Sequence, residues 1–138
     1  VISDGLVEED QTADSAVTFV NTPTTSSEVG LPIDVEIKTM PIDLRTVGGT
    51  RIGFKKRIVE VNALLHETQN IVINDNLVPI RTLGDDALDD EVPEFTGTKV
   101  LHGILGYSNE GQITVTQSVP LKLTLLGLEY KIATHQGT

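Results

Sequence analysis

The side chains best suited to catalysis or metal binding are scattered along this chain. His66, His102 and His135 lie far apart in the sequence, whereas zinc ligands usually follow one another at short, regular spacings. The chain has no cysteine, so it can form neither a disulfide nor a thiolate metal site. It also lacks a phosphate-binding loop and a Gly-x-Ser-x-Gly motif. The residue types therefore indicate no metal site, no cofactor and no catalytic centre.

A second group to consider is the acidic run DDALDDEVPE at residues 85–94. Clustered carboxylates can bind calcium, but this run lacks the order of acids, glycine and final glutamate that a calcium-binding loop has. Asp89 and Asp90 could act as an acid-base pair, yet no second catalytic group lies at a defined spacing from them. We interpret the run as an exposed, solvated loop and predict that the chain is not an enzyme.

Charge is distributed unevenly. The net charge is −10, from 20 acidic and 10 basic residues, and the acids concentrate at residues 4–14 and 85–94. The basic region contains Arg45, Arg51, Lys55, Lys56 and Arg57. An acidic chain is poorly suited to gripping phosphates, so we expect DNA not to be bound specifically. The acids could simply keep the protein dispersed, or they could form a wall past which a polyanion slides.

Lys55, Lys56 and Arg57 are the candidate subunit interface, because a basic cluster can form salt bridges with acids of a neighbouring subunit. Two other interpretations stay open for this cluster. It could be the solvated end of a strand, or it could contact phosphate.

The central segment, residues 53–82, must position this basic cluster. After Arg57, apolar and polar residues alternate as in a strand with one buried face, although the same residues also fit a helix. The β-branched run Ile58-Val59 favours a strand. Asn74, Asp75 and Asn76 then predict a turn into a second extended segment that ends at Pro79.

The rest of the chain also resembles a series of strands. Residues 33–40 alternate with period two, and residues 109–111 have the composition of a hairpin connection. The apolar phase of residues 121–132 changes at Gly127, which predicts a β-bulge. We expect one domain over residues 1–138, an all-β, antiparallel β-sandwich or barrel of about six to eight strands with long polar loops.

The alternation also predicts which residues form the core. We expect burial of Val59, Val61, Ala63 and Leu65 together with Leu121, Leu123 and Leu125, and greater exposure of Glu60, Asn62, Lys122 and Thr124. Replacing Leu123 with alanine should then destabilise the fold by about 2 to 5 kcal/mol.

Neither a membrane-spanning segment nor a signal sequence is predicted. No apolar run approaches the roughly 20 residues that cross a bilayer. The first residue is Val1 and the only methionine is Met40. We therefore expect the chain to be a fragment of a longer protein.

Six segments together resemble the distal part of tail tubular protein B, the nozzle protein of short-tailed bacteriophages. They occur in the order of that family within residues 29–132: GLP at 30–32, KTMPID at 38–43, GFKKRIVEVNALLHET at 53–68, VPIRT at 78–82, PEFTG at 93–97 and GQITVTQSVPLKLTLLGLEYKI at 111–132. Each motif is short, and the resemblance rests on their order.

The resemblance implies a structural protein of the virion tail, made in the cytoplasm of the bacterial host. Nozzle proteins form a homohexameric tube below the portal and adaptor rings, through which the genome leaves and to which receptor-binding fibres or spikes attach. Two other classes stay open: a β-sandwich adhesin or binding module for carbohydrate or protein, and a fragment of a glycan hydrolase. Only five aromatic residues are present, which argues against a carbohydrate-binding platform.

Overall fold

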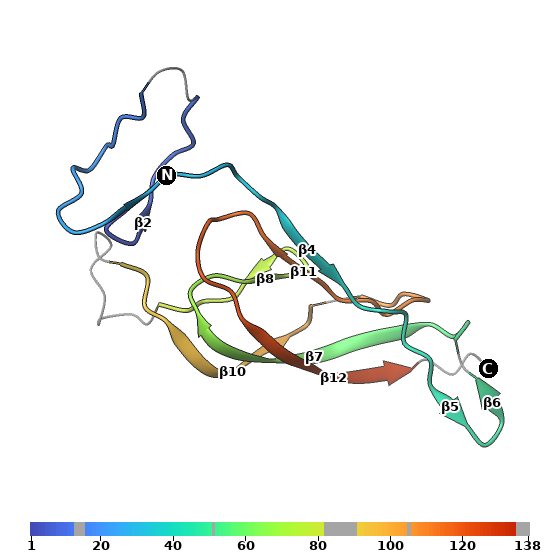
Figure 1. The fold of residues 1–138 in the computed structure, drawn as a ribbon. Helices are drawn as coiled ribbons and strands as arrows, with labels where there is room; N and C mark the ends of the chain where they lie inside the picture. Colours follow the sequence, from blue (N-terminus) through green and yellow to red (C-terminus); the bar gives the residue numbers. More distant parts are fainter. Residues whose placement is uncertain (13–15, 51, 82–90, 105, 135–138) are drawn as a thin grey trace.

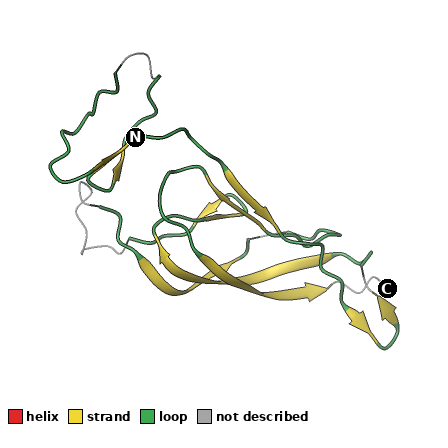
Figure 2. Ribbon diagram, in the orientation of Figure 1, coloured by secondary structure: helices red, strands yellow, loops and turns green. Residues whose placement is uncertain are grey.

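The structure is a computed structural model that describes residues 1–12, 16–50, 52–81, 91–104 and 106–134. It is all-β, and every strand pairing is antiparallel (Figures 1 and 2). The strands of the described residues are β1 (Ile2–Ser3), β2 (Leu6–Val7), β3 (Ser27–Glu28), β4 (Val35–Lys38), β5 (Arg45–Thr46), β6 (Gly49–Thr50), β7 (Lys56–Thr68), β8 (Val72–Ile73), β9 (Asn76–Leu77), β10 (Phe95–His102), β11 (Thr114–Gln117) and β12 (Leu125–Thr134).

Two sheets share the hydrophobic core and make the fold consistent with a β-sandwich. One has the order β10-β7-β12 and the other the order β4-β11-β8-β9, and neither closes into a barrel. Buried aliphatic side chains from both sheets form one cluster, which includes Val61 and Leu65 of β7, Ile73 of β8 and Val115 of β11. The predicted fold class is therefore confirmed.

Strand β7 runs through the centre of its sheet, and its buried face changes phase twice. The buried side chains are those of even-numbered residues at Lys56 and Ile58, and of odd-numbered residues from Val61 to Leu65. At Thr68 an even-numbered side chain is buried again. Both changes are β-bulges. Val59 is the extra residue between the pairs Lys131↔Glu60 and Ile132↔Ile58, and two residues of β7 face one of β10 between Leu65 and Thr68.

These bulges explain where the predicted core is correct and where it is wrong. The strand itself is confirmed over the helix, and Val61, Ala63 and Leu65 are buried as expected. Val59 is exposed because the first bulge turns it outward, and Ile58 is buried in its place.

The leucines expected opposite this strand are less buried than predicted. Leu121, Leu123 and Leu125 are only half-buried, and Leu123 and Leu125 pack at the margin of the core. Lys122 is exposed, whereas Thr124 is half-buried like the leucines around it. Replacing Leu123 with alanine should therefore cost less than a fully buried leucine would.

Turn chemistry was predicted with mixed success. Asn74 and Asp75 both have positive φ and join β8 to β9 in a two-residue hairpin. The predicted bulge at Gly127 is confirmed, because Leu126 is an extra residue between the pairs Leu125↔Leu65 and Gly127↔Leu64. Residues 109–111 do not form a hairpin connection, since β10 and β11 belong to different sheets. Residues 16–20 have a β-prone composition but are not a strand.

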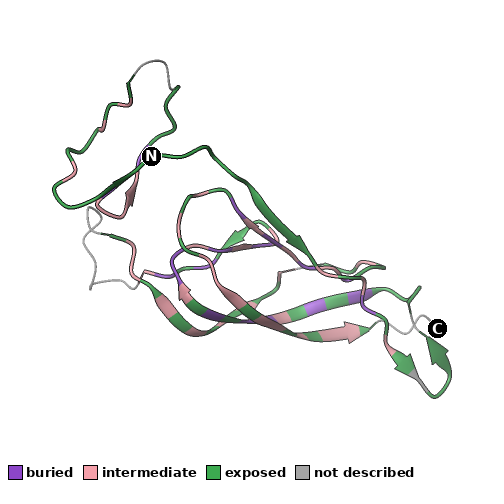
Figure 3. Ribbon diagram, in the orientation of Figure 1, coloured by how far each residue is buried: buried purple, intermediate pink, exposed green. Residues whose placement is uncertain are grey.

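Residues 1–12 and 16–28 form a separate N-terminal lobe, seen at the upper left of Figures 1 and 3. Its three short strands have the order β2-β1-β3, and no residue before Ile42 belongs to the hydrophobic core. Carboxylates bound to the backbone hold this lobe together. The Glu8 carboxylate accepts hydrogen bonds from the N–H groups of Val20 and Asn21 at 3.0 and 2.9 Å.

Asp4 plays the same role more completely. Its carboxylate accepts hydrogen bonds from the N–H groups of Thr24, Thr25 and Ser26 at 2.7 to 2.8 Å, and from the Thr24 hydroxyl at 2.9 Å. These bonds, led by that from the Thr24 N–H, hold the pKa of the Asp4 carboxyl well below its usual range.

Acid is therefore expected to loosen the N-terminal lobe. Because the pKa of Asp4 is lower in the folded than in the unfolded state, its stabilising contribution is complete above the unfolded pKa of about 3.9 and is lost as pH falls toward the folded pKa. Protection of the Thr25 and Ser26 amides against hydrogen exchange, compared with an unfolded chain at the same pH, should fall over this range. Asp4→Asn should already show faster exchange at neutral pH, whereas Asp10→Asn, at an exposed position, should not. Equal exchange in both variants would contradict this role.

Candidate functional site

The basic end of the molecule is built by the hairpin of β5 and β6 and by the residues that follow it. Arg45 lies on β5 with a side chain that is 90 % exposed, and its Nε lies 3.9 Å from Oδ2 of Asp43. Lys55 and Arg57 are exposed on either side of the first residue of β7. Arg51 lies outside the described residues. Three cations of the described chain thus face solvent at this end.

Lys56 does not face solvent with its neighbours, so the expected three-residue interface is wrong at this position. Its side chain is completely buried, and its Nζ donates hydrogen bonds to the backbone oxygens of Ile52 and Asn109, both at 2.7 Å. The backbone of Lys56 also exchanges hydrogen bonds with Ser108. Strand alternation explains the difference, because adjacent side chains point to opposite faces. The candidate interface therefore loses Lys56 and keeps Lys55 and Arg57. Arg45, which is exposed at the same end of the molecule, is added to it.

The acidic end is the N-terminal lobe. The first 37 residues contain no lysine or arginine, and the described lobe includes Asp4, Glu8, Glu9, Asp10 and Glu28. Glu8 and Asp4 are occupied by backbone donors, while Glu9, Asp10 and Glu28 are exposed. The second acidic run expected from the sequence lies mostly outside the described residues, which resume at position 91.

The two charged ends lie at opposite extremes of an elongated molecule. Figure 1 shows the N-terminal lobe at the upper left and the β5–β6 hairpin at the lower right, with the sandwich between them. Opposite charges at opposite ends favour association in which one end of a copy meets the other end of the next.

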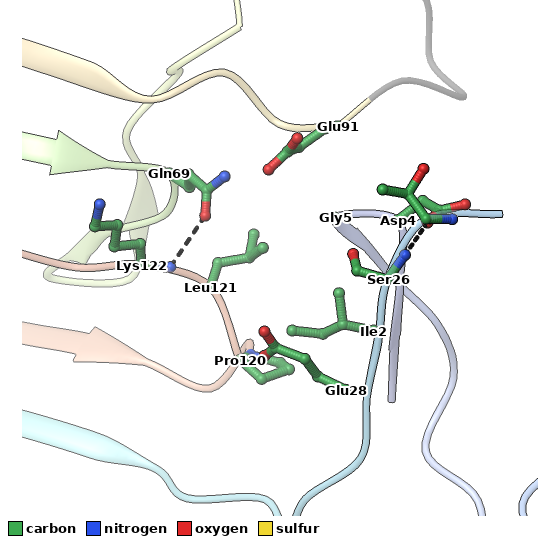
Figure 4. A pocket seen from close by; sticks show the side chains of 11 residues that line it. Ile2, Asp4, Gly5, Ser26, Glu28, Gln69, Glu91, Pro120, Leu121 and Lys122 are labelled. Atoms are coloured by element: carbon green, nitrogen blue, oxygen red, sulfur yellow. Dashed lines mark hydrogen bonds between the residues drawn. The ribbon is translucent and has the colours of Figure 1, made fainter. Parts of the chain in front are cut away.

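A hollow of about 420 Å³ separates the N-terminal lobe from the sandwich (Figure 4). Its charged lining includes Asp4, Glu28, Glu91 and Lys122. Asp4 is held by backbone donors, and Lys122 donates to the carboxylates of Glu67 and Glu94 at 2.6 and 3.1 Å. The Glu67 hydrogen bond raises the pKa of Lys122, so this amine stays charged and is not available as a base at neutral pH.

The remaining candidate side chains do not come together in the described part of the chain. His66 and His102 are exposed and each lies beside one glutamate, at 3.8 and 3.5 Å, while His135 lies outside the described residues. In that part, no three histidine, cysteine or acidic side chains gather where they could hold a metal ion. Nor do the described residues include a helix long and apolar enough to span a membrane.

Comparison with known proteins adds no further assignment. No protein-family model matches the chain, and no curated protein matches its sequence.

The roles of the buried Lys56 and the backbone-bound Asp4 were both missed by sequence reasoning. Asp4-Gly5 does carry a turn signal, but the bonds of Asp4 to residues twenty positions away leave no local pattern.

Proposed function

We propose that this chain is a structural component of a short phage tail, part of the ring-shaped nozzle through which the genome leaves the particle. The order of the six segments that resemble tail tubular protein B supports this family. The observation from the structure that carries the proposal is the separation of charge, with Lys55, Arg57 and Arg45 at one end and the acidic N-terminal lobe at the other.

A closed ring needs contacts in which one surface of a subunit meets a different surface of the next. The two ends of this chain offer such a pair of surfaces, and their charges are complementary. In the proposed assembly, six copies form the ring, the adaptor lies above it, and tail fibres or spikes attach to it. The protein is then made in the bacterial cytoplasm and ends up in the virion tail.

DNA passes through this ring without specific binding. Twenty acids against ten bases leave no net attraction for phosphate, and cationic contacts along the conduit would retard the genome.

Reversing the exposed charges of the basic end should weaken association of the chain. We expect Lys55→Glu with Arg57→Glu to reduce self-association in sedimentation velocity at low ionic strength, because the acidic lobe would then face acids. Lys56 is left unchanged, since its burial would confuse loss of contact with loss of folding. Added salt should produce part of the same defect, as exposed charges are screened beyond about 8 Å at physiological ionic strength.

Two controls make this test specific. Lys55→Arg with Arg57→Lys keeps the charge and should associate like the original chain. Glu9→Lys with Asp10→Lys should restore association when this variant is mixed with the reversed basic end. Unchanged association in the Lys55→Glu, Arg57→Glu variant would remove these residues from the interface.

A further inference from the structure

Among the described strands, β4 lies at the edge of the four-stranded sheet, next to β11. The Thr39 N–H donates to the Ile113 oxygen at 2.9 Å, and Ile37 pairs with Val115 in the same register. In an antiparallel ladder the backbone groups of alternate residues point to opposite sides. The odd residues of β4 therefore turn their N–H and C=O groups toward β11, and Glu36 and Lys38 turn theirs outward.

A stripe of exposed apolar residues extends along the segment before β4 and along β4 itself. Every residue from 24 to 38 is exposed. The apolar residues occupy alternate positions, with exposed fractions as follows: Val29 58 %, Leu31 90 %, Ile33 76 %, Val35 39 % and Ile37 45 %. Val35 and Ile37 lie on the core-facing side of the sheet, because they pair with the buried Gln117 and Val115. The opposite sheet leaves them uncovered.

The two edge strands of the other core sheet, β10 and β12, carry features that discourage pairing with another chain. β10 turns Lys99 toward the core side, where its Nζ lies 4.4 Å from the centre of the Phe95 ring, and its pairing with β7 contains a register shift. β12 is interrupted by two register shifts. Inward-pointing charges and bulges are the usual means of blocking an edge. β4 has neither, since its pairing with β11 is regular and Val35 and Ile37 are its core-facing residues.

We propose that β4 pairs with β4 of a second copy, antiparallel, around a twofold axis at Ile37. Hydrogen bonds between the two β4 edges use the backbone groups of Glu36 and Lys38, which point outward. Each of these residues must therefore lie opposite Glu36 or Lys38 of the second copy. With Ile37 opposite Ile37, each Glu36 faces Lys38 of the other copy, and both pairs are attractive. A shift of one pairing step in one direction places Glu36 opposite Glu36 and Asp34 opposite Lys38. A shift in the other direction places Lys38 opposite Lys38, so either shift puts like charges opposite each other at the axis.

The Ile37 register is thus the one of these three in which no like charges lie opposite each other, and in it the apolar stripe continues across the axis. The two four-stranded sheets become one sheet that spans both copies. Such a contact is isologous, because the same surface is used by both partners. It is independent of the proposed function, whose contacts lie at the two charged ends.

Charge reversals at the two outward-facing residues test this pairing. The measurement is sedimentation velocity over a range of concentrations, made in the Lys55→Glu, Arg57→Glu background so that association through the charged ends does not contribute. Glu36→Lys and Lys38→Glu should each raise the dimer dissociation constant on the order of tenfold, because each puts like charges opposite each other twice. The double variant Glu36→Lys, Lys38→Glu restores both pairs and should dimerise like the parent.

Glu129→Lys is the matched control, because it makes the same charge change at an exposed position of β12 and should leave dimerisation unchanged. Mixed isotope labelling should also give contacts between the Ile37 side chains of two copies. A chain that stays monomeric at all concentrations would overturn the proposal. So would a double variant that dimerises no better than the single ones.

Discussion

Replacing Lys56 with alanine is expected to lower the free energy of unfolding by about 2 to 4 kcal/mol. The substitution removes a fully buried side chain and leaves the backbone oxygens of Ile52 and Asn109 without their charged donor. The lysine stem also packs beside Gly111, where an added Cβ would lie 3.5 Å from its Cδ. Urea denaturation measures this loss, as a shift of the transition midpoint when the dependence of the unfolding free energy on urea concentration is unchanged.

Lys55→Ala provides the matched control one residue earlier. Lys55 is exposed, so the change should stay within about 0.5 kcal/mol. Lys56→Met keeps much of the stem but removes the donors, and its loss should fall between those of the two alanine variants. If Lys56→Ala were no more harmful than Lys55→Ala, the buried hydrogen bonds would not contribute to stability.

Replacing Leu65 with alanine should destabilise the fold by about 2 to 5 kcal/mol, because the sandwich cannot close fully over the cavity. Leu65 is completely buried in β7, where it pairs with Gly97 on one side and Leu125 on the other. Thermal or urea unfolding followed by circular dichroism gives the value.

The adjacent leucine provides a control of identical chemistry. Leu64 is 45 % exposed on the opposite face of the same strand, so Leu64→Ala should cost much less. Equal losses at the two positions would mean that the burial phase of this part of β7 has been assigned incorrectly.

Sequence patterns predict where the strands of this protein lie better than they predict which strands pair with one another and in what register. The β-branched run after Arg57 and the Asn-Asp turn are local signals, and both are present in the structure. The exposure of Val59 could not be predicted in this way, since it follows from a register shift opposite Lys131 and Ile132, which lie far away in the sequence. The alternation over residues 33–40 likewise carries no sign that β4 is an uncovered edge.

The candidate interface was predictable only in part for a similar reason. The acidic and basic runs are visible in the sequence, but their location at opposite ends depends on the fold. Lysine is almost always exposed unless it is paired. The burial of Lys56 depends on the backbone carbonyl groups of Ile52 and Asn109. Asn109 lies 53 positions from Lys56 in the sequence, so no local pattern predicts this contact.

The two bulges of β7 also determine where the chain can change in length. Removing one residue at Val59 or Glu67 would bring Ile58 and Val61, or Leu65 and Thr68, into ordinary alternation on the same face. Removing one between Val61 and Leu65 would turn every later side chain to the wrong face. A relative of this protein could therefore lack one residue at either bulge and keep the same core. An alignment that allows no gap inside β7 would then misplace half of the strand.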